Sequence, residues 1–164
     1  MERMSVNGVE LAVEVQGTGE PVLLVHGASI ADAYAPLLAE PALAGRYRLI
    51  TYHRRGYAGS SRADGPVSIA EQAADARAVL HHAGVERAHL VGHSYGGVVA
   101  LQLALDTPEA VHSLVLLEPG LVNLVPGGGP FFESLGPLFA AYQAGDNAGA
   151  IDGLERAIMG PDYR

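Results

Sequence analysis

Apolar and polar positions alternate at the start of the chain, and longer apolar runs follow. The alternation covers residues 3–15 and is interrupted by Asn7-Gly8, a dipeptide that suits the positive backbone angles of a tight hairpin turn. The pattern therefore predicts two antiparallel strands. Further strands are predicted where apolar residues run together, at 21–27, 46–52, 88–92 and 113–119; such unbroken runs are typical of strands buried on both faces.

Helical periodicity separates these apolar runs. Residues 68–83 show it most clearly, because Ser68 and Glu71 form a capping box, one face is apolar, and Gly84 follows at the expected helix end. Other helices are predicted at 32–43, where two prolines interrupt the pattern, and at 94–106, 131–145 and 148–159. Strands and helices alternate from residue 21 to 119, which predicts an α/β fold with a mostly parallel sheet covered by helices on both faces.

The alternation stops after Pro119. A loop with three consecutive glycines, Gly127 to Gly129, comes next, and only helical patterns follow it. We therefore predict two regions: an α/β core over residues 1–120 and a second, helical region over 121–164.

Composition narrows the class of protein. The 164 residues are 49% hydrophobic and carry a formal net charge of −8, which disfavours disorder and binding to nucleic acid or to an anionic membrane. Cysteine is absent, so thiolate metal sites are excluded and a reducing compartment is favoured. Residues 1–10 lack the apolar core of a signal peptide, and no apolar run is long enough to span a bilayer. We expect a cytoplasmic protein with no membrane partner.

A serine between glycines joins the predicted strand 88–92 to the predicted helix 94–106. Gly92 and Gly96 lie two positions on either side of Ser94, in the pattern G-x-S-x-G. A serine at the apex of a sharp strand-to-helix turn has a strained backbone, and glycines two residues away remove the collisions that side chains would cause. A dinucleotide-binding turn requires G-x-G-x-x-G instead. The pattern therefore predicts that Ser94 is presented as a nucleophile.

On these residues the sequence resembles the α/β-hydrolase superfamily, in the branch of lid-bearing serine hydrolases. The segment LLVHGAS, residues 23–29, resembles the family's oxyanion strand and loop. The resemblance implies that the amides of Ala28 and Tyr95 form the oxyanion hole, and that residues 121–164 begin the lid. The segment YHRRGYAGSS resembles the family stretch Asp-x-Arg-Gly-x-Gly-x-Ser, with His53 in place of aspartate and Ala58 in place of glycine.

A general base for Ser94 is not evident in the chain. In this fold the acid and then the histidine follow the serine, and the only later histidine, His112, enters the strand 113–119 at its amino end, roughly 20 Å from Ser94. Glu118 ends that strand at the correct edge of the sheet and is a candidate acid or a pocket residue. We expect the histidine beyond Arg164, in a chain that represents the first part of a hydrolase.

The predicted reaction is hydrolysis of an ester, lactone, thioester or activated carbon–carbon bond, without a metal or organic cofactor. Serine at position 94 argues against the dehalogenase and epoxide hydrolase branches, which the resemblance associates with a carboxylate nucleophile. An apolar acyl or aromatic substrate is expected. The candidate pocket residues are Ser29, His53, Phe131, Leu135, Phe139 and Tyr142. The alternative is a non-catalytic ligand-binding or regulatory protein on the same fold.

The strand that contains residues 113–118 is expected to form an edge of the sheet. An edge strand exposes unpaired amides and carbonyls, and this one has few charges to discourage pairing. We therefore expect a partner across this edge, either the protein's own C-terminal half or another copy of the chain.

Overall fold

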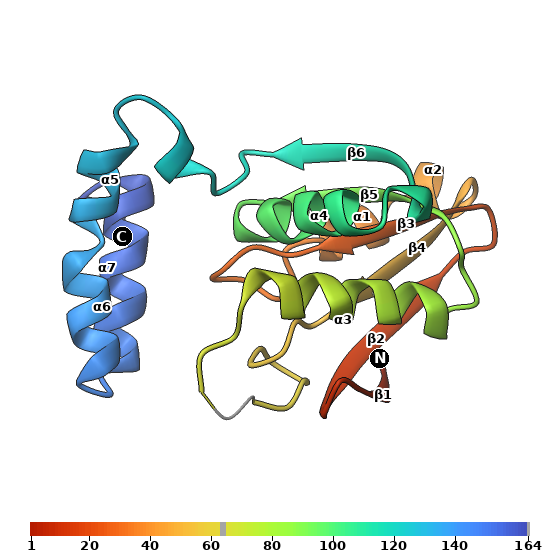
Figure 1. Cartoon of the computed structure of the whole chain (residues 1–164), viewed down its shortest axis with the longest axis horizontal. Coiled ribbons are helices and arrows are strands. Elements are labelled where there is room, and N and C mark those ends of the chain that lie inside the picture. The colour runs from red at the N-terminus through yellow and green to blue at the C-terminus, as the bar shows by residue number, and fades with distance from the viewer. Residues whose placement is uncertain (63–64, 164) are drawn as a thin grey trace. The chain divides into compact units, whose positions relative to one another are not determined.

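The computed structural model describes residues 1–62 and 65–163, which form two compact units, Met1–Gly120 and Leu121–Arg164. In the described part of the first unit, one sheet has the strand order β1-β2-β4-β3-β5-β6 (Figure 1). The strands are β1 (Glu2–Val6), β2 (Val9–Gln16), β3 (Glu20–Val25), β4 (Tyr47–Tyr52), β5 (Ala88–His93) and β6 (Val111–Leu117). Strands β3 to β6 pair in parallel, which confirms the predicted α/β class.

The first two strands form the predicted hairpin. Val6 pairs with Val9, and the two residues between them have positive φ angles, 47° at Asn7 and 78° at Gly8. These angles match the turn that best fits the twist of paired strands. Strand β2 then pairs antiparallel with β4, so the hairpin extends the parallel part of the sheet on one side.

Helices cover both faces of the sheet, as predicted. The helices of the first unit are α1 (Ala35–Leu38), α2 (Pro41–Ala44), α3 (Ile69–His82), α4 (Tyr95–Asp106) and the 3₁₀ turn η1 (Pro108–Ala110). The buried side chains of α3 and α4 pack against Leu23 and Val25 of β3 in the main core. The alternate residues Val22 and Leu24 point to the other face, where Leu38 of α1 packs.

Two predicted segments differ from the structure in detail. The stretch 32–43 forms two separate short helices, because Pro36 and Pro41 each occupy a first helical turn, where the missing amide hydrogen costs nothing. Strand β6 was predicted to be buried, yet Val115 is 44% and Leu117 42% exposed. The reason is its place at the end of the described strand order, where one face of the strand lacks cover.

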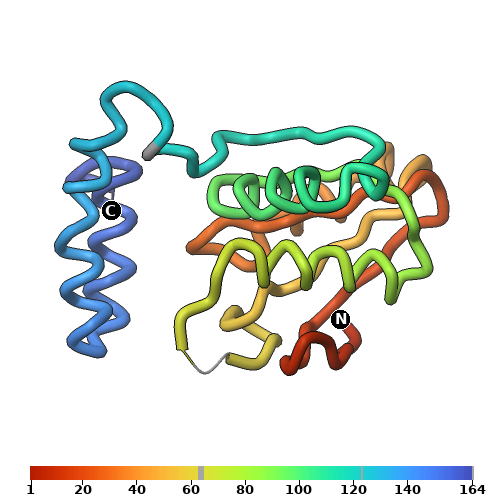
Figure 2. Tube along the Cα trace, viewed as in Figure 1, coloured from red at the N-terminus to blue at the C-terminus, as the bar shows by residue number. Residues whose placement is uncertain are grey.

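The second unit is helical. It contains the 3₁₀ turn η2 (Val122–Leu124) and the helices α5 (Gly128–Ser134), α6 (Gly136–Gln143) and α7 (Asn147–Met159). The single helix predicted over 131–145 is therefore wrong: Pro137 has no amide hydrogen to continue the helical ladder, and a new helix begins there. Helices α6 and α7 lie side by side (Figure 2). In the described residues, no helix is both long and apolar enough to cross a membrane.

Candidate active site

Ser94 lies at the tip of a sharp turn between β5 and α4. Its backbone angles are φ 52° and ψ −123°, a conformation that non-glycine residues rarely adopt and that is costly to maintain. A Cβ on Gly92 would lie 2.5 Å from the carbonyl oxygen of Gly96, and one on Gly96 would lie 2.2 Å from that of Val25. The turn can therefore form only with glycine at both positions, which explains the G-x-S-x-G spacing in physical terms.

The loop after β3 lies directly against this turn. A Cβ on Gly27 would lie 3.3 Å from the Cβ of Ser94, so the absence of a side chain permits the close approach. In the described part of the chain, the next amide, that of Ala28, donates no hydrogen bond to another protein group. Tyr95 begins α4, and the first amides of a helix have no acceptor within it. Both predicted oxyanion donors thus lie next to Ser94.

Buried hydrogen bonds hold the loop after β3 in place. The Nδ1 of His26 is 2.8 Å from the carbonyl oxygen of Gly27, and its Nε2 accepts from the backbone amide of Arg54 at 2.9 Å. Because Nε2 accepts, the hydrogen must be on Nδ1, which donates to Gly27. The hydroxyl of Tyr34 donates to the carbonyl of Val25, and burial raises its pKa to about 12, so it remains protonated.

Burial and the neighbouring Arg54 charge lower the pKa of His26 from 6.5 to about 4. Between these two pH values the unfolded chain therefore binds more protons at His26 than the folded chain does. The contribution of His26 to the free energy of unfolding is fully present above about pH 6.5 and is lost as the pH falls to about 4. The loss is up to about 3 kcal/mol in the free energy of unfolding.

We expect His26→Gln to flatten the dependence of the free energy of unfolding on pH between 7.5 and 4.5 in denaturant titrations. His81→Gln, which removes an exposed histidine, should keep the wild-type slope; equal slopes in all three proteins would contradict this assignment.

His53 is buried and forms hydrogen bonds through both ring nitrogens. Nδ1 accepts from the amide of Gly59 at 3.0 Å, and Nε2 is 3.0 Å from Oδ1 of Asp32. The hydrogen bond between His53 and Asp32 joins the loop after β4 to the loop after β3. With both nitrogens engaged, His53 has no free lone pair to act as a base for Ser94. Ala58, where the family pattern has glycine, has a φ of 39°, a conformation that favours glycine.

Glu118 follows β6 beside the serine turn. The amide of Ser94 donates to the carbonyl of Leu117 at 2.9 Å, and the amide of Gly120 donates to the carbonyl of Ser94 at 2.9 Å. Glu118 lies between these two contacts, is exposed, and has a positive φ of 43°. It is therefore close to Ser94 in the fold, and its role as acid or pocket residue stays a prediction.

None of the described hydrogen bonds joins the Ser94 hydroxyl to a histidine. His112 lies at the far end of the sheet, where its ring centroid is 4.5 Å from that of His89. His93 lies beside the loop after β3, with Nδ1 3.1 Å from where a Cβ on Gly27 would be. The described residues also contain no group of three or more His, Asp or Glu side chains placed to hold a metal ion.

The remaining predicted pocket residues are divided between the two units. Ser29 is exposed in the loop after Ala28. The other four belong to the second unit: Phe131 is half-buried, Leu135 is buried, and Phe139 and Tyr142 are exposed. Phe139 faces Phe132, which was not predicted, with ring centroids 6.1 Å apart. A substrate pocket built from these aromatic side chains stays a prediction.

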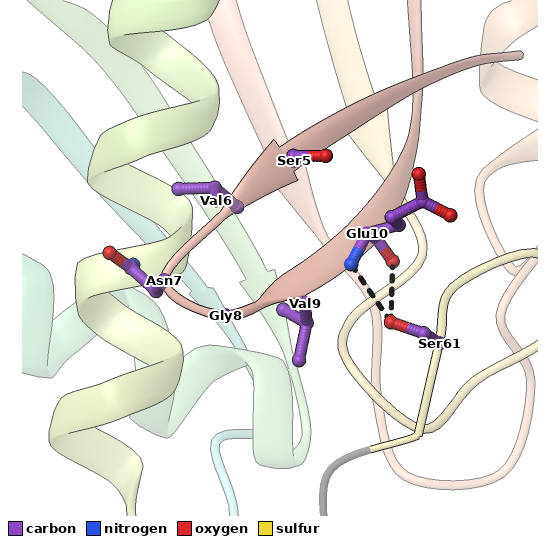
Figure 3. Close-up of a pocket in the computed structure, with 7 residues that line it drawn as sticks. All are labelled: Ser5, Val6, Asn7, Gly8, Val9, Glu10 and Ser61. Atoms are coloured by element: carbon purple, nitrogen blue, oxygen red, sulfur yellow. Dashed lines mark hydrogen bonds between the residues drawn. The ribbon is translucent and has the colours of Figure 1, made fainter.

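A hollow of about 480 Å³ lies beside the β1–β2 hairpin (Figure 3) and is lined by residues 5–10 and Ser61. The Ser61 hydroxyl accepts from the amide of Glu10 at 2.8 Å and lies 3.3 Å from its carbonyl oxygen. Among the described residues that line it, Glu10 is the only charged one. The hollow contains none of the predicted site residues, and we assign it no role in the chemistry.

Comparison with known proteins identifies the family. The sequence model of the protein family described as "alpha/beta hydrolase fold" matches residues 20–158. The chain belongs to the α/β-hydrolase family. The match covers the strand–turn–helix that contains Ser94 and most of the second, helical unit.

Individual relatives differ in their named chemistry. RutD of Azorhizobium caulinodans, assigned as a carbamate hydrolase, is 42% identical over 109 residues, or 66% of this chain and 40% of the relative. A fluoroacetate dehalogenase of a Burkholderia species is 35% identical over 70% of this chain and 39% of its own. The solved structure of Est816, described as an N-acyl homoserine lactone degrading enzyme, has a TM-score of 0.73 and 30% identity, covering 93% of this chain and 56% of that one. The chain thus spans about 40% of the length of these two curated relatives.

Sequence reasoning did not find several residues that shape the site. Asp32, Arg54 and Gln72 all contact the loops around Ser94. Their partners are 18 to 28 residues away in sequence, so no local pattern reveals them. The only available signal was the paired arginine in HRRG, which marks Arg54 and Arg55 without indicating their separate partners.

Proposed function

We propose that this chain carries the nucleophile and oxyanion hole of a serine hydrolase that acts on an acyl substrate: an ester, lactone or thioester, or an activated carbon–carbon bond. Ser94 attacks the substrate carbonyl, and the amides of Ala28 and Tyr95 receive the negative charge that develops on its oxygen. The observation that carries the proposal is the strained backbone of Ser94, accommodated by glycines at 92 and 96.

Serine at position 94 favours a different reaction from the one that the names of some relatives describe. Serine is a neutral hydroxyl that needs a general base, and we propose that this base is supplied by a histidine outside the described residues. The fluoroacetate dehalogenase relative acts on a carbon–halogen bond by its name. The structural neighbour Est816 is described as an N-acyl homoserine lactone degrading enzyme, and a lactone is an acyl compound, which supports an acyl substrate for this chain.

A substrate panel tests the reaction class. The complete gene product is expected to hydrolyse short aryl esters and a lactone, and to release no fluoride from fluoroacetate. The control is Arg3→Gln, which removes an exposed charge on β1 and should leave all rates unchanged. Fluoride release without ester hydrolysis would contradict the acyl assignment. Binding without turnover of any substrate would favour the alternative, a ligand-binding protein on this fold.

We further propose that a strand pairs with the free edge of β6, supplied by later residues of the same protein or by another copy of the chain. Support comes from the terminal place of β6 in the described strand order and from the exposed side chains of Val115 and Leu117. Such an edge presents a row of unpaired backbone groups and invites association.

For residues 1–164 alone, we expect the sedimentation coefficient to rise with concentration, and Val115→Lys to suppress that rise by placing a charge on the edge strand. Leu105→Lys is the matched control, because Leu105 is 68% exposed but lies on α4. A concentration-independent monomer whose 113–118 amides resist hydrogen exchange would contradict the proposal.

A further inference from the structure

A buried arginine lies against the loop that bears the first oxyanion donor. Arg54 is only 1% exposed. Its Nε donates to the carbonyl of His26 at 3.1 Å, one terminal nitrogen donates to the carbonyl of Gly27 at 2.7 Å, and the other donates to Oε1 of Gln72. Among the described residues no carboxylate forms an ion pair with it. The adjacent Arg55, by contrast, forms a two-point ion pair with Asp75 at 2.6 and 2.7 Å.

We infer that Arg54 is a positioning residue of the oxyanion hole, an inference that rests on the proposed function. The carbonyl of Gly27 and the amide of Ala28 belong to one peptide group. Two hydrogen bonds reach that carbonyl, from Arg54 at 2.7 Å and from His26 at 2.8 Å. Hydrogen bonds to one end of a peptide polarise it and strengthen the donor at the other end. Arg54 thus fixes the orientation of the Ala28 amide and makes it a better donor to an oxyanion.

The same side chain contacts the residue that supplies the second donor. The guanidinium carbon of Arg54 lies 4.9 Å from the ring centroid of Tyr95. Gln72 completes the connection, because its Nε2 donates to the Tyr95 hydroxyl at 3.2 Å while its Oε1 accepts from Arg54. One buried cation therefore links the peptide of Gly27 and Ala28 to Tyr95, and holds the two predicted donors in fixed relation to each other.

The charge itself supports a functional role. Burying a cation without a counter-ion is costly, and neutral acceptors such as carbonyls and aromatic faces offset only part of that cost. A fixed positive charge that polarises a donor to the developing oxyanion stabilises the charged transition state more than the neutral ground state. The effect should therefore appear in kcat rather than in KM.

The kinetic test uses Arg54→Met and Arg54→Lys in the complete gene product. Methionine retains the length of the side chain but removes its charge and donors, and kcat for an aryl ester should fall by about 10- to 100-fold with little change in KM. Lysine keeps the charge but cannot contact two carbonyls and Gln72 together, so its kcat should lie between those of Arg54→Met and the wild type.

The matched control is Arg55→Met, which changes the adjacent arginine of the same loop, also buried. Loss of a partner from the buried pair with Asp75 should lower the unfolding midpoint, while kcat per folded molecule stays at the wild-type value. A spectroscopic readout does not depend on turnover: the ¹⁵N resonance of Ala28 should move upfield in Arg54→Met and stay in place in Arg55→Met. If Arg54→Met does not fold, Arg54→Lys carries both measurements.

The outcomes separate this inference from the proposed function. If a fluorophosphonate labels Ser94 and Arg54→Met retains the wild-type kcat, the inference is overturned and the nucleophile assignment stands. If the wild type neither hydrolyses esters nor reacts with the probe, the proposed function fails. The Ala28 resonance then decides alone: an upfield shift in Arg54→Met supports polarisation of the peptide, and an unchanged shift overturns it.

Discussion

Ser94→Ala is expected to lower kcat/KM for a short aryl ester by a factor of about 10⁴ or more in the complete gene product. The physical reason is the loss of the hydroxyl that we propose attacks the substrate, on a residue whose backbone the turn between β5 and α4 holds in a strained conformation. Alanine has almost the same volume, so the fold should be retained. The ratio of kcat/KM between variant and wild type is measured with purified proteins at equal concentration. Equal thermal unfolding midpoints show that the variant is folded.

The control for this substitution is Ser113→Ala. Ser113 lies in β6, where it pairs with His89 rather than with the serine turn. Its removal should leave kcat/KM at the wild-type value. If Ser94→Ala retained most of the activity, another residue would have to be the nucleophile, and the strained turn would need a different explanation.

The second large effect concerns residues 1–164 by themselves. We expect this chain to hydrolyse the same ester about 10⁴-fold or more slowly than the complete gene product, since loss of the general base alone costs about that much. The geometry supports the expectation because both ring nitrogens of His53 are engaged and His112 lies at the opposite end of the sheet.

Comparable rates for the two proteins would contradict this expectation. In that case one of the histidines near the turn would have to be the base, and His93 is the first candidate because its Nδ1 lies 3.1 Å from where a Cβ on Gly27 would be. His93→Gln in residues 1–164 would then abolish the remaining rate, whereas His112→Gln would not.

The fold was largely predictable because its signals are local. The hairpin follows from the positive φ angles that Asn7-Gly8 accepts, and the serine turn follows from the spacing of Gly92 and Gly96. The break between α5 and α6 could also have been predicted, since Pro137 cannot continue a helical ladder. The break was not predicted because apolar residues keep a helical spacing on both sides of that proline.

The support of the site was not predictable because it depends on distant segments. Arg54 reaches residues 26 and 27 on one side and Gln72 on the other, and only the folded chain brings these together. The exposure of β6 has a similar origin: its apolar residues are typical of a buried strand, and burial depends on what covers it. Sequence pattern indicates which side chains favour burial, but not which neighbours are present.

The most direct test of the central claim is the site of covalent labelling by a fluorophosphonate probe. The complete gene product is treated with the probe, digested and analysed by peptide mass spectrometry, with Ser94→Ala and Ser113→Ala treated in parallel. The expected result is a single adduct on the peptide that contains Ser94, present in Ser113→Ala and absent from Ser94→Ala. An adduct on another residue, or none in the wild type, would contradict the assignment of Ser94 as the nucleophile.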